Sequence, residues 1–183
     1  MVGFAGRLVN AKGLQDLFLA LENLVGDWSL LVVGDGELRP ELEAQAQANK
    51  WRARFVGYVG IDDMPQYFSA MDCLVLPSRT MPDWKEQFGL VLAQAMACRV
   101  PVIGSSSGAI PEVIEDAGLI FPERDVEALR HCLQKLMDDE PYRQGLAQKG
   151  YERALAKYSA TGLADETYLL FQKLLANRIE KLV

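Results

Sequence analysis

The sequence predicts an α/β domain built on a doubly wound parallel sheet. Three observations support this fold class: short apolar runs lack polar alternation, helix-like segments separate them, and the runs end in glycine, serine or charged residues. Strands of this kind are buried on both faces by the intervening helices. Such sheets bind ligands outside the carboxyl ends of their strands, so we expect the chemistry in the loops after Gly6, Gly34, Gly57, Ser78 and Ser105.

Strands and helices alternate along the predicted core. Residues 2–6 (VGFAG) are a short buried strand, and apolar residues then recur at helical spacing from Leu14 to Val25. Further strands are expected at 28–36, 53–60, 72–78 and 100–106, with a candidate sixth at 118–122, and further helices at 38–50, 64–71, 88–98 and 110–115.

The chain is predicted to be helical after the last strand. An apolar stripe begins after Asp125, and a final helix runs from Leu163 to about Lys181. The other face of that helix mixes acids and bases, which favours packing against protein over a membrane surface. We expect a single domain over residues 1–183, with a Rossmann-like core at about 1–122 and a helical region at about 123–183.

Composition excludes several classes of protein. Half of the 183 residues are hydrophobic, which supplies an ample core and argues against disorder. The net charge of -6 is spread along the chain without a basic face, so nucleic acid is not an expected partner. No secretion signal is visible, and the apolar runs fall short of the roughly 18 residues of a membrane span. A soluble domain is expected.

Cysteine and histidine usage argues against a metal site. Cys73, Cys98 and Cys132 are odd in number and widely spaced, and His131 is the only histidine. A disulfide framework or zinc cluster needs closer or more numerous ligands. We therefore expect reduced thiols, no metal and a cytoplasmic chain, with His131 on the surface.

Two cations bracket the turn after the first strand. Arg7 and Lys12 lie on either side of a strand-to-helix junction, where free N–H groups and the helix dipole favour an anion such as a diphosphate. The alternative is a pair of solvated loop charges. Neither the Gly-x-Gly-x-x-Gly dinucleotide fingerprint nor the Gly-Lys-Ser/Thr phosphate loop is present here, so simple NAD and ATP sites are not indicated.

Glycines follow the second and third strands. Gly34 ends the second strand, and Gly57 and Gly60 flank Tyr58 and Val59 after the third. Glycine allows backbone to approach a flat ligand closely, so main-chain groups could read a base edge. Each glycine taken alone is more often an ordinary turn.

The stretch KEQFGLVLAQA carries an acid before Phe88-Gly89 and a glutamine eight positions after the acid. Glu86 at a helix mouth could accept hydrogen bonds from sugar hydroxyls, and the amides near Leu90 could hold a phosphate. Gln94 is expected about 9 Å further along the helix axis, near another part of the same ligand. Its alternative role is a solvent-facing helix residue.

Several short stretches occur in one order over nearly the whole chain: Gly6-Arg7 with Lys12-Gly13, FVGYV, LVLPS, EQFG, AMA, PVIGSSSG with IPEVI, and GLIF. Together they resemble the C-terminal half of retaining glycosyltransferases of the GT-B fold, in the large family 4 group. The resemblance implies that the chain is the donor domain, which binds a nucleotide-diphospho-sugar. It also implies retaining transfer to a polysaccharide, lipid or small glycoside without a metal.

The resemblance implies a role for each matching residue. Arg7 and Lys12 match the basic pair that holds the donor diphosphate and stabilises the leaving group, and Glu86 matches the acid that contacts the donor sugar. Gln94 stands at the position that binds the ribose diol. The amides of Phe88, Gly89 and Leu90 would lie against sugar and phosphate, the loop of Tyr58 and Val59 would read the base, and Gly6 and Gly34 would complete the donor site.

Three departures from the family pattern stand out. Glutamine at position 94 replaces an acid, which removes charge assistance from a diol contact and adds an NH2 donor. Arg99 replaces a glycine at a helix C-terminus, so the turn must be built otherwise or carry strain. The N-terminal acceptor domain is absent. We expect this acceptor domain in the same chain or in another chain, and we expect any peripheral membrane contact to be made through it.

Two other functions compete with the donor-domain hypothesis. Gln94 and the missing acceptor half are also consistent with a non-catalytic nucleotide-sugar sensor or partner subunit. A sugar-nucleotide 2-epimerase would share the fold superfamily, but it would need more acids and histidines in the loops than this chain has.

Overall fold

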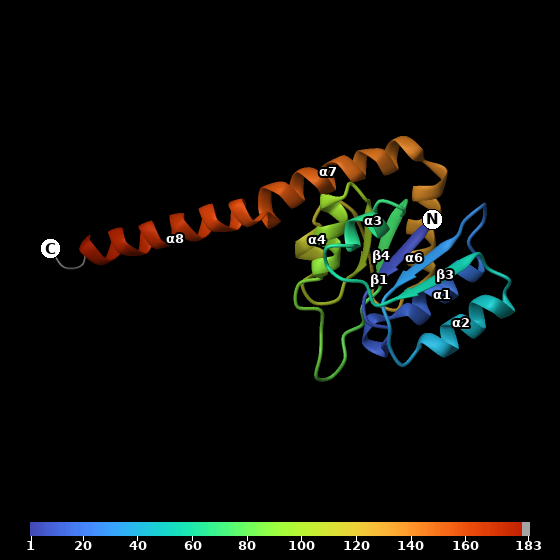
Figure 1. Cartoon of the computed structure of the whole chain (residues 1–183). Coiled ribbons are helices and arrows are strands. Elements are labelled where there is room, and N and C mark those ends of the chain that lie inside the picture. Colours follow the sequence, from blue (N-terminus) through green and yellow to red (C-terminus); the bar gives the residue numbers. More distant parts are fainter. Residues whose placement is uncertain (181–183) are drawn as a thin grey trace.

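The computed structural model describes residues 1–180 and centres on a six-stranded sheet whose paired strands are all parallel (Figure 1). The strands are β1 (Val2–Ala5), β2 (Leu30–Val33), β3 (Ala53–Gly57), β4 (Cys73–Leu76), β5 (Val102–Ser105) and β6 (Leu119–Phe121), in the order β3-β2-β1-β4-β5-β6. The predicted doubly wound parallel sheet is confirmed.

Helices separate the strands and continue after the last one. They are α1 (Leu14–Glu22), α2 (Arg39–Ala48), α3 (Met64–Phe68), α4 (Leu90–Ala97), α5 (Ile110–Ile114), α6 (Val126–Asp138), α7 (Glu140–Tyr158) and α8 (Ala160–Glu180), with a 3-10 turn at Asn10–Lys12. α1 packs against α6, while α4 packs against α7 and α3. Every residue of β1, β2, β4 and β5 is buried, as expected for strands covered on both faces.

The sheet has a topological switch point between β1 and β4. These strands are neighbours, with Val2 opposite Cys73 and Gly3 opposite Leu74. From β1 the chain winds outward through β2 and β3, and it then returns to β4 and winds the other way. The connections on either side diverge and leave a crevice at the carboxyl edge, where doubly wound sheets bind their ligands.

Element boundaries differ from the sequence prediction by a few residues at several places. The third strand ends at Gly57 instead of residue 60, and the last helix begins at Ala160 instead of Leu163. α4 begins at Leu90 because Gly89 has a φ of 80°, a left-handed conformation that does not continue a helix toward Phe88.

Arg99 takes the conformation usually given to glycine. Its φ is 58°, so the turn after α4 is closed by a left-handed arginine, as anticipated for a turn that lacks glycine. The guanidinium stacks on the Tyr151 ring, 3.7 Å from its centroid, and donates to Gln148. Two contacts with α7 therefore hold a strained residue in place.

The thiols and the histidine lie as predicted. Cys73 is buried, and desolvation raises the pKa of its thiol to about 12, so it is not a nucleophile at neutral pH. Cys98 and Cys132 are partly buried free thiols, and His131 is exposed on α6. In the part of the chain that the structure describes, no helix has both the length and the apolar character to cross a bilayer.

α8 leaves the body of the domain. It follows α7 after a single extended residue, Ser159, and projects away from the sheet (Figure 1). Its large apolar side chains are exposed, among them Tyr168, Phe171 and Leu175.

Gly145, inside α7, is a site where alanine should stabilise the domain. A Cβ at this position would meet no atom within 4 Å, so the substitution meets no steric obstacle. Glycine costs a helix interior about 1 kcal/mol relative to alanine. We expect Gly145→Ala to raise the free energy of unfolding by about that amount, as measured by urea denaturation. An unchanged or lower value would contradict the open surroundings of this residue.

Candidate functional site

The loops at the carboxyl edge bring most of the predicted ligand-binding residues together. A cavity of 380 Å³ lies there, between the ends of β1, β2 and β3 and one side of α4. Six of the residues that line it were predicted from the sequence: Gly6, Arg7, Gly34, Tyr58, Val59 and Gln94.

Tight backbone contacts shape the floor of this cavity. Gly34 has a φ of 128°, and a Cβ on it would stand 1.9 Å from the carbonyl oxygen of Gly6. Only glycine therefore allows the loops after β1 and β2 to come this close. Tyr58 is 87% exposed at the rim, so its ring is available to a ligand rather than committed to the core.

Two charged side chains line the cavity, the cation Arg7 and the acid Asp35. Arg7 is exposed, and within residues 1–180 no acid forms a salt bridge with it. Asp35 accepts from the amide of Gly36 at 2.8 Å and from Arg39 at 2.9 Å, which lowers the pKa of its carboxyl group. Arg7 thus remains free to pair with a ligand anion, while Asp35 is already engaged.

Lys12 and Glu86 are not among the residues that line this cavity, but they meet each other after the neighbouring strands β1 and β4. Lys12 Nζ lies 2.6 Å from Glu86 Oε2, and Ser78 Oγ donates to the same oxygen at 2.9 Å. The two charged side chains are 15% and 9% exposed. Both contacts fall on Oε2, so among the described residues no hydrogen-bond donor engages Oε1.

The backbone explains why Lys12 reaches Glu86. Lys12 ends the 3-10 turn, and Gly13 with a φ of 66° then starts α1. A Cβ on Gly13 would stand 1.9 Å from the carbonyl oxygen of Pro77, so this turn packs directly on the end of β4. Since β1 and β4 are neighbours, the loop after each strand reaches the same point of the edge.

The long loop between β4 and α4 carries residues near Lys12 that the sequence analysis missed. Trp84 lies beneath Lys12, with 5.0 Å between Nζ and the ring centroid. Arg79 forms a two-pronged ion pair with Asp16 of α1, whose side chain is 4% exposed, and this hydrogen bond raises the pKa of Arg79. The sequence feature that could have pointed to Trp84 is its position two residues before Glu86.

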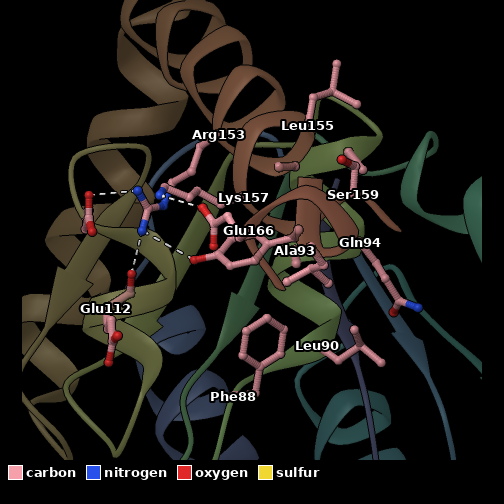
Figure 2. A pocket seen from close by; sticks show the side chains of 15 residues that line it. Phe88, Leu90, Ala93, Gln94, Glu112, Arg153, Leu155, Lys157, Ser159 and Glu166 are labelled. Atoms are coloured by element: carbon pink, nitrogen blue, oxygen red, sulfur yellow. Dashed lines mark hydrogen bonds and ion pairs between the residues drawn. The ribbon is translucent and has the colours of Figure 1, made fainter. Parts of the chain in front are cut away.

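The residues around the start of α4 divide between two cavities. Phe88 and Leu90 line a second cavity of 570 Å³, bounded by α4, α5 and the junction of α7 and α8. Figure 2 shows both side chains at its lower edge and Gln94 at its right-hand edge. Gln94 lines both cavities, whereas Gly89 lies buried, with its Cα facing Leu92. Gln94 is half-buried at the boundary of the two cavities, and its role in ribose binding stays a prediction.

A resident metal has no evident ligand set in this part of the molecule. Within residues 1–180, no group of three or more histidine, cysteine, aspartate or glutamate side chains is arranged to hold an ion. The polar groups of the edge are instead suited to anions and hydroxyls.

Fold and site together define a Rossmann-like α/β domain with a cavity at the carboxyl edge of its sheet, where doubly wound folds bind their ligands. The family model described as "Glycosyl transferases group 1" matches residues 1–139. The chain belongs to this family.

Individual relatives agree with this assignment. The chain is 33% identical over 159 residues to a GDP-mannose-dependent phosphatidylinositol monomannoside mannosyltransferase of Corynebacterium glutamicum, a match that covers 84% of this chain and 42% of that protein. It is 26% identical to an alpha-D-kanosaminyltransferase of Streptomyces kanamyceticus over 95% of this chain and 46% of the other. The chain thus spans less than half the length of these curated relatives.

Solved structures identify which half is present. The C-terminal domain of a group 1 glycosyl transferase from Francisella tularensis superposes with a TM-score of 0.76 at 28% identity, covering 87% of this chain and 86% of that one. Sucrose-phosphate synthase from Thermosynechococcus elongatus gives a TM-score of 0.80 at 29% identity, covering 96% and 46%. The fold is that of a C-terminal domain of a GT-B glycosyltransferase.

Proposed function

We propose that this chain is the donor domain of a retaining glycosyltransferase. It binds a nucleotide-diphospho-sugar and acts with an acceptor-binding domain in the same or another chain. The observation that carries the proposal is a 380 Å³ cavity at the carboxyl edge lined by Arg7 and Gln94, together with the Lys12–Glu86 ion pair at the ends of the neighbouring strands β1 and β4. The corynebacterial relative, whose name specifies a GDP-mannose donor, supports the same class of substrate.

The donor would extend along the crevice. Its base would lie near Tyr58 and Val59, the ribose near Gln94, and the diphosphate between Arg7 and Lys12. Oε1 of Glu86 would accept from a sugar hydroxyl, because Oε2 is already occupied by Lys12 and Ser78. Glutamine at position 94 provides one carbonyl acceptor and one amide donor for the diol.

The chemistry of the site is mainly electrostatic. In retaining transfer, the bond between the anomeric carbon and the diphosphate oxygen breaks while the acceptor oxygen bonds to the same face of that carbon. The acceptor hydroxyl passes its proton to the departing phosphate oxygen. Negative charge grows on the diphosphate during this step, and Arg7 and Lys12 stabilise it.

Direct binding tests the proposal. UDP, GDP, ADP and their common hexose conjugates are titrated into the 183-residue chain by calorimetry. We expect one nucleotide class to bind and the other two to bind at least tenfold more weakly. Absence of binding by all three diphosphates would overturn the proposal.

A non-catalytic sensor is the competing function, and Gln94 is the observation that favours it, because an amide replaces the expected acid at the ribose position. A sensor binds the donor without turnover. Sugar transfer by the chain joined to a matching N-terminal acceptor domain would therefore exclude a sensor.

A further inference from the structure

The short segment that carries Glu86 and Phe88 is held by the turn that precedes α5. The amide of Ala109 donates to the carbonyl oxygen of Glu86 at 2.9 Å. Gly108, with a φ of 55°, leaves no room for a Cβ, which would stand 1.9 Å from that same oxygen. The position of Glu86 therefore follows the position of the turn at residues 108–109.

α5 is in turn held by hydrogen bonds from one side chain of α7, Arg153. Arg153 donates from Nε to the carbonyl oxygen of Val113 at 2.8 Å and from Nη2 to that of Glu112 at 2.6 Å. Nη1 also pairs with the carboxylate of Glu115 at 2.7 Å. Figure 2 shows this contact of Arg153 with Glu112 at the left-hand side of the second cavity. The guanidinium thus fixes the carbonyl end of a helix of one to two turns.

Tyr158, the last residue of α7, contacts both α5 and Phe88. Its hydroxyl donates to the carbonyl oxygen of Val113 at 3.2 Å and accepts from Arg153 at 3.3 Å. Its ring packs edge-on against Phe88, with 5.3 Å between centroids and 86° between planes. Phe88 is 38% exposed, so this ring pair provides much of the restraint on its side chain.

We infer that Tyr158 is a positioning residue for the sugar-contacting segment. Tyr158 and Arg153 together restrain residues 86–88 at two points, and we call this arrangement the brace. Both side chains hold α5, whose preceding turn bonds the backbone of Glu86, and the ring of Tyr158 contacts Phe88. The inference rests on the proposed function, because it assigns these contacts to the part of the site that would recognise the donor sugar. Diphosphate binding should depend on this brace less than sugar binding does, because Arg7 lies on the loop after β1, outside the braced segment.

The first test needs no ligand. Hydrogen exchange is measured on the free protein for Tyr158→Ala and for Tyr151→Ala. Tyr151 is the matched control, because it is a tyrosine of the same helix whose ring packs on Arg99 instead of Phe88. We expect amides 86–90 to exchange about five- to tenfold faster in Tyr158→Ala only, in the range that an edge-to-face ring pair contributes. Equal exchange in both variants would overturn the brace.

The second test concerns the sugar. For each variant the dissociation constant of the nucleoside diphosphate is divided by that of the matching nucleotide-sugar. We expect this ratio to fall about fivefold in Tyr158→Ala. It should stay within twofold of the original in two controls: Tyr158→Phe, which keeps the ring, and Tyr151→Ala. An unchanged ratio in Tyr158→Ala would refute the positioning role.

The outcomes remain separable. If Tyr158→Ala fails to fold, Tyr158→Leu, which keeps a larger apolar side chain than alanine but removes the ring, takes its place in both tests. If the unmodified chain binds no nucleotide, the proposed function fails, while the exchange experiment still decides whether Tyr158 restrains residues 86–88.

Discussion

Replacement of Lys12 by methionine is expected to weaken binding of the nucleoside diphosphate by roughly 10- to 100-fold. A hydrogen bond to a charged group contributes about 1.5–3 kcal/mol, and each 1.4 kcal/mol is a factor of ten in affinity. The variant also leaves the carboxylate of Glu86, 9% exposed, beside the incoming diphosphate without its cation. Calorimetric titration of the matching diphosphate measures the effect.

Matched variants show whether the loss is specific. Lys149, on α7, pairs with Asp116 and is 57% exposed, so Lys149→Met removes a charge far from the crevice and should leave affinity within twofold. Arg7→Ala should weaken binding by a similar factor to Lys12→Met, because both cations would face the diphosphate. Unchanged affinity in both site variants would rule out this diphosphate position.

The double variant Lys12→Met with Glu86→Gln separates binding from stability. Lys12→Met alone should lower the free energy of unfolding, because it leaves a nearly buried carboxylate unpaired. Glu86→Gln removes that carboxylate charge and should restore much of the stability. Diphosphate affinity should remain low, since the cation is still missing.

The second large effect is expected at Gly108. Gly108→Ala should cost about 3 kcal/mol of unfolding free energy, because a left-handed alanine is strained and its Cβ overlaps the backbone of Glu86. Urea denaturation measures the cost, and Gly145→Ala, which meets nothing within 4 Å, is the matched control for the same chemical change. Equal stability of the two variants would contradict the close packing of residues 86 and 108.

The fold was readable from the sequence because its signals are local. Apolar runs without alternation, such as that ending at Val33, mark strands buried on both faces, and they were found in the predicted order. The start of α4 was misjudged by two residues because Gly89 is left-handed, and a Cβ there would stand 3.0 Å from Leu92 and 3.2 Å from Leu76. Boundaries depend on such tertiary contacts more than the existence of an element does.

The candidate site was only partly predictable. Residues at strand ends, such as Gly6 and Arg7, could be assigned to one edge because parallel strands end on the same side. The pairing of Lys12 with Glu86 spans 74 positions, and it depends on β1 and β4 being neighbours, which no local pattern encodes. Their roles in donor binding remain predictions.

Long-range partners explain what the sequence analysis overlooked. Asp16 looks like an ordinary acid in the first turn of α1, yet Arg79 makes it a buried anchor for the loop after β4. Tyr158 likewise looks like one aromatic residue among several in the C-terminal helices until its contact with Phe88 is seen.

The single extended residue between α7 and α8 makes α8 a mechanical lever. Its 21 residues correspond to a rod of about 31 Å, so a rotation of about 10° at Ser159 would sweep the far end through about 5 Å. Tyr158 stands at the pivot and touches Phe88. A spectroscopic label in the second half of α8 would therefore report any rotation at Ser159 as a displacement that a distance measurement can resolve.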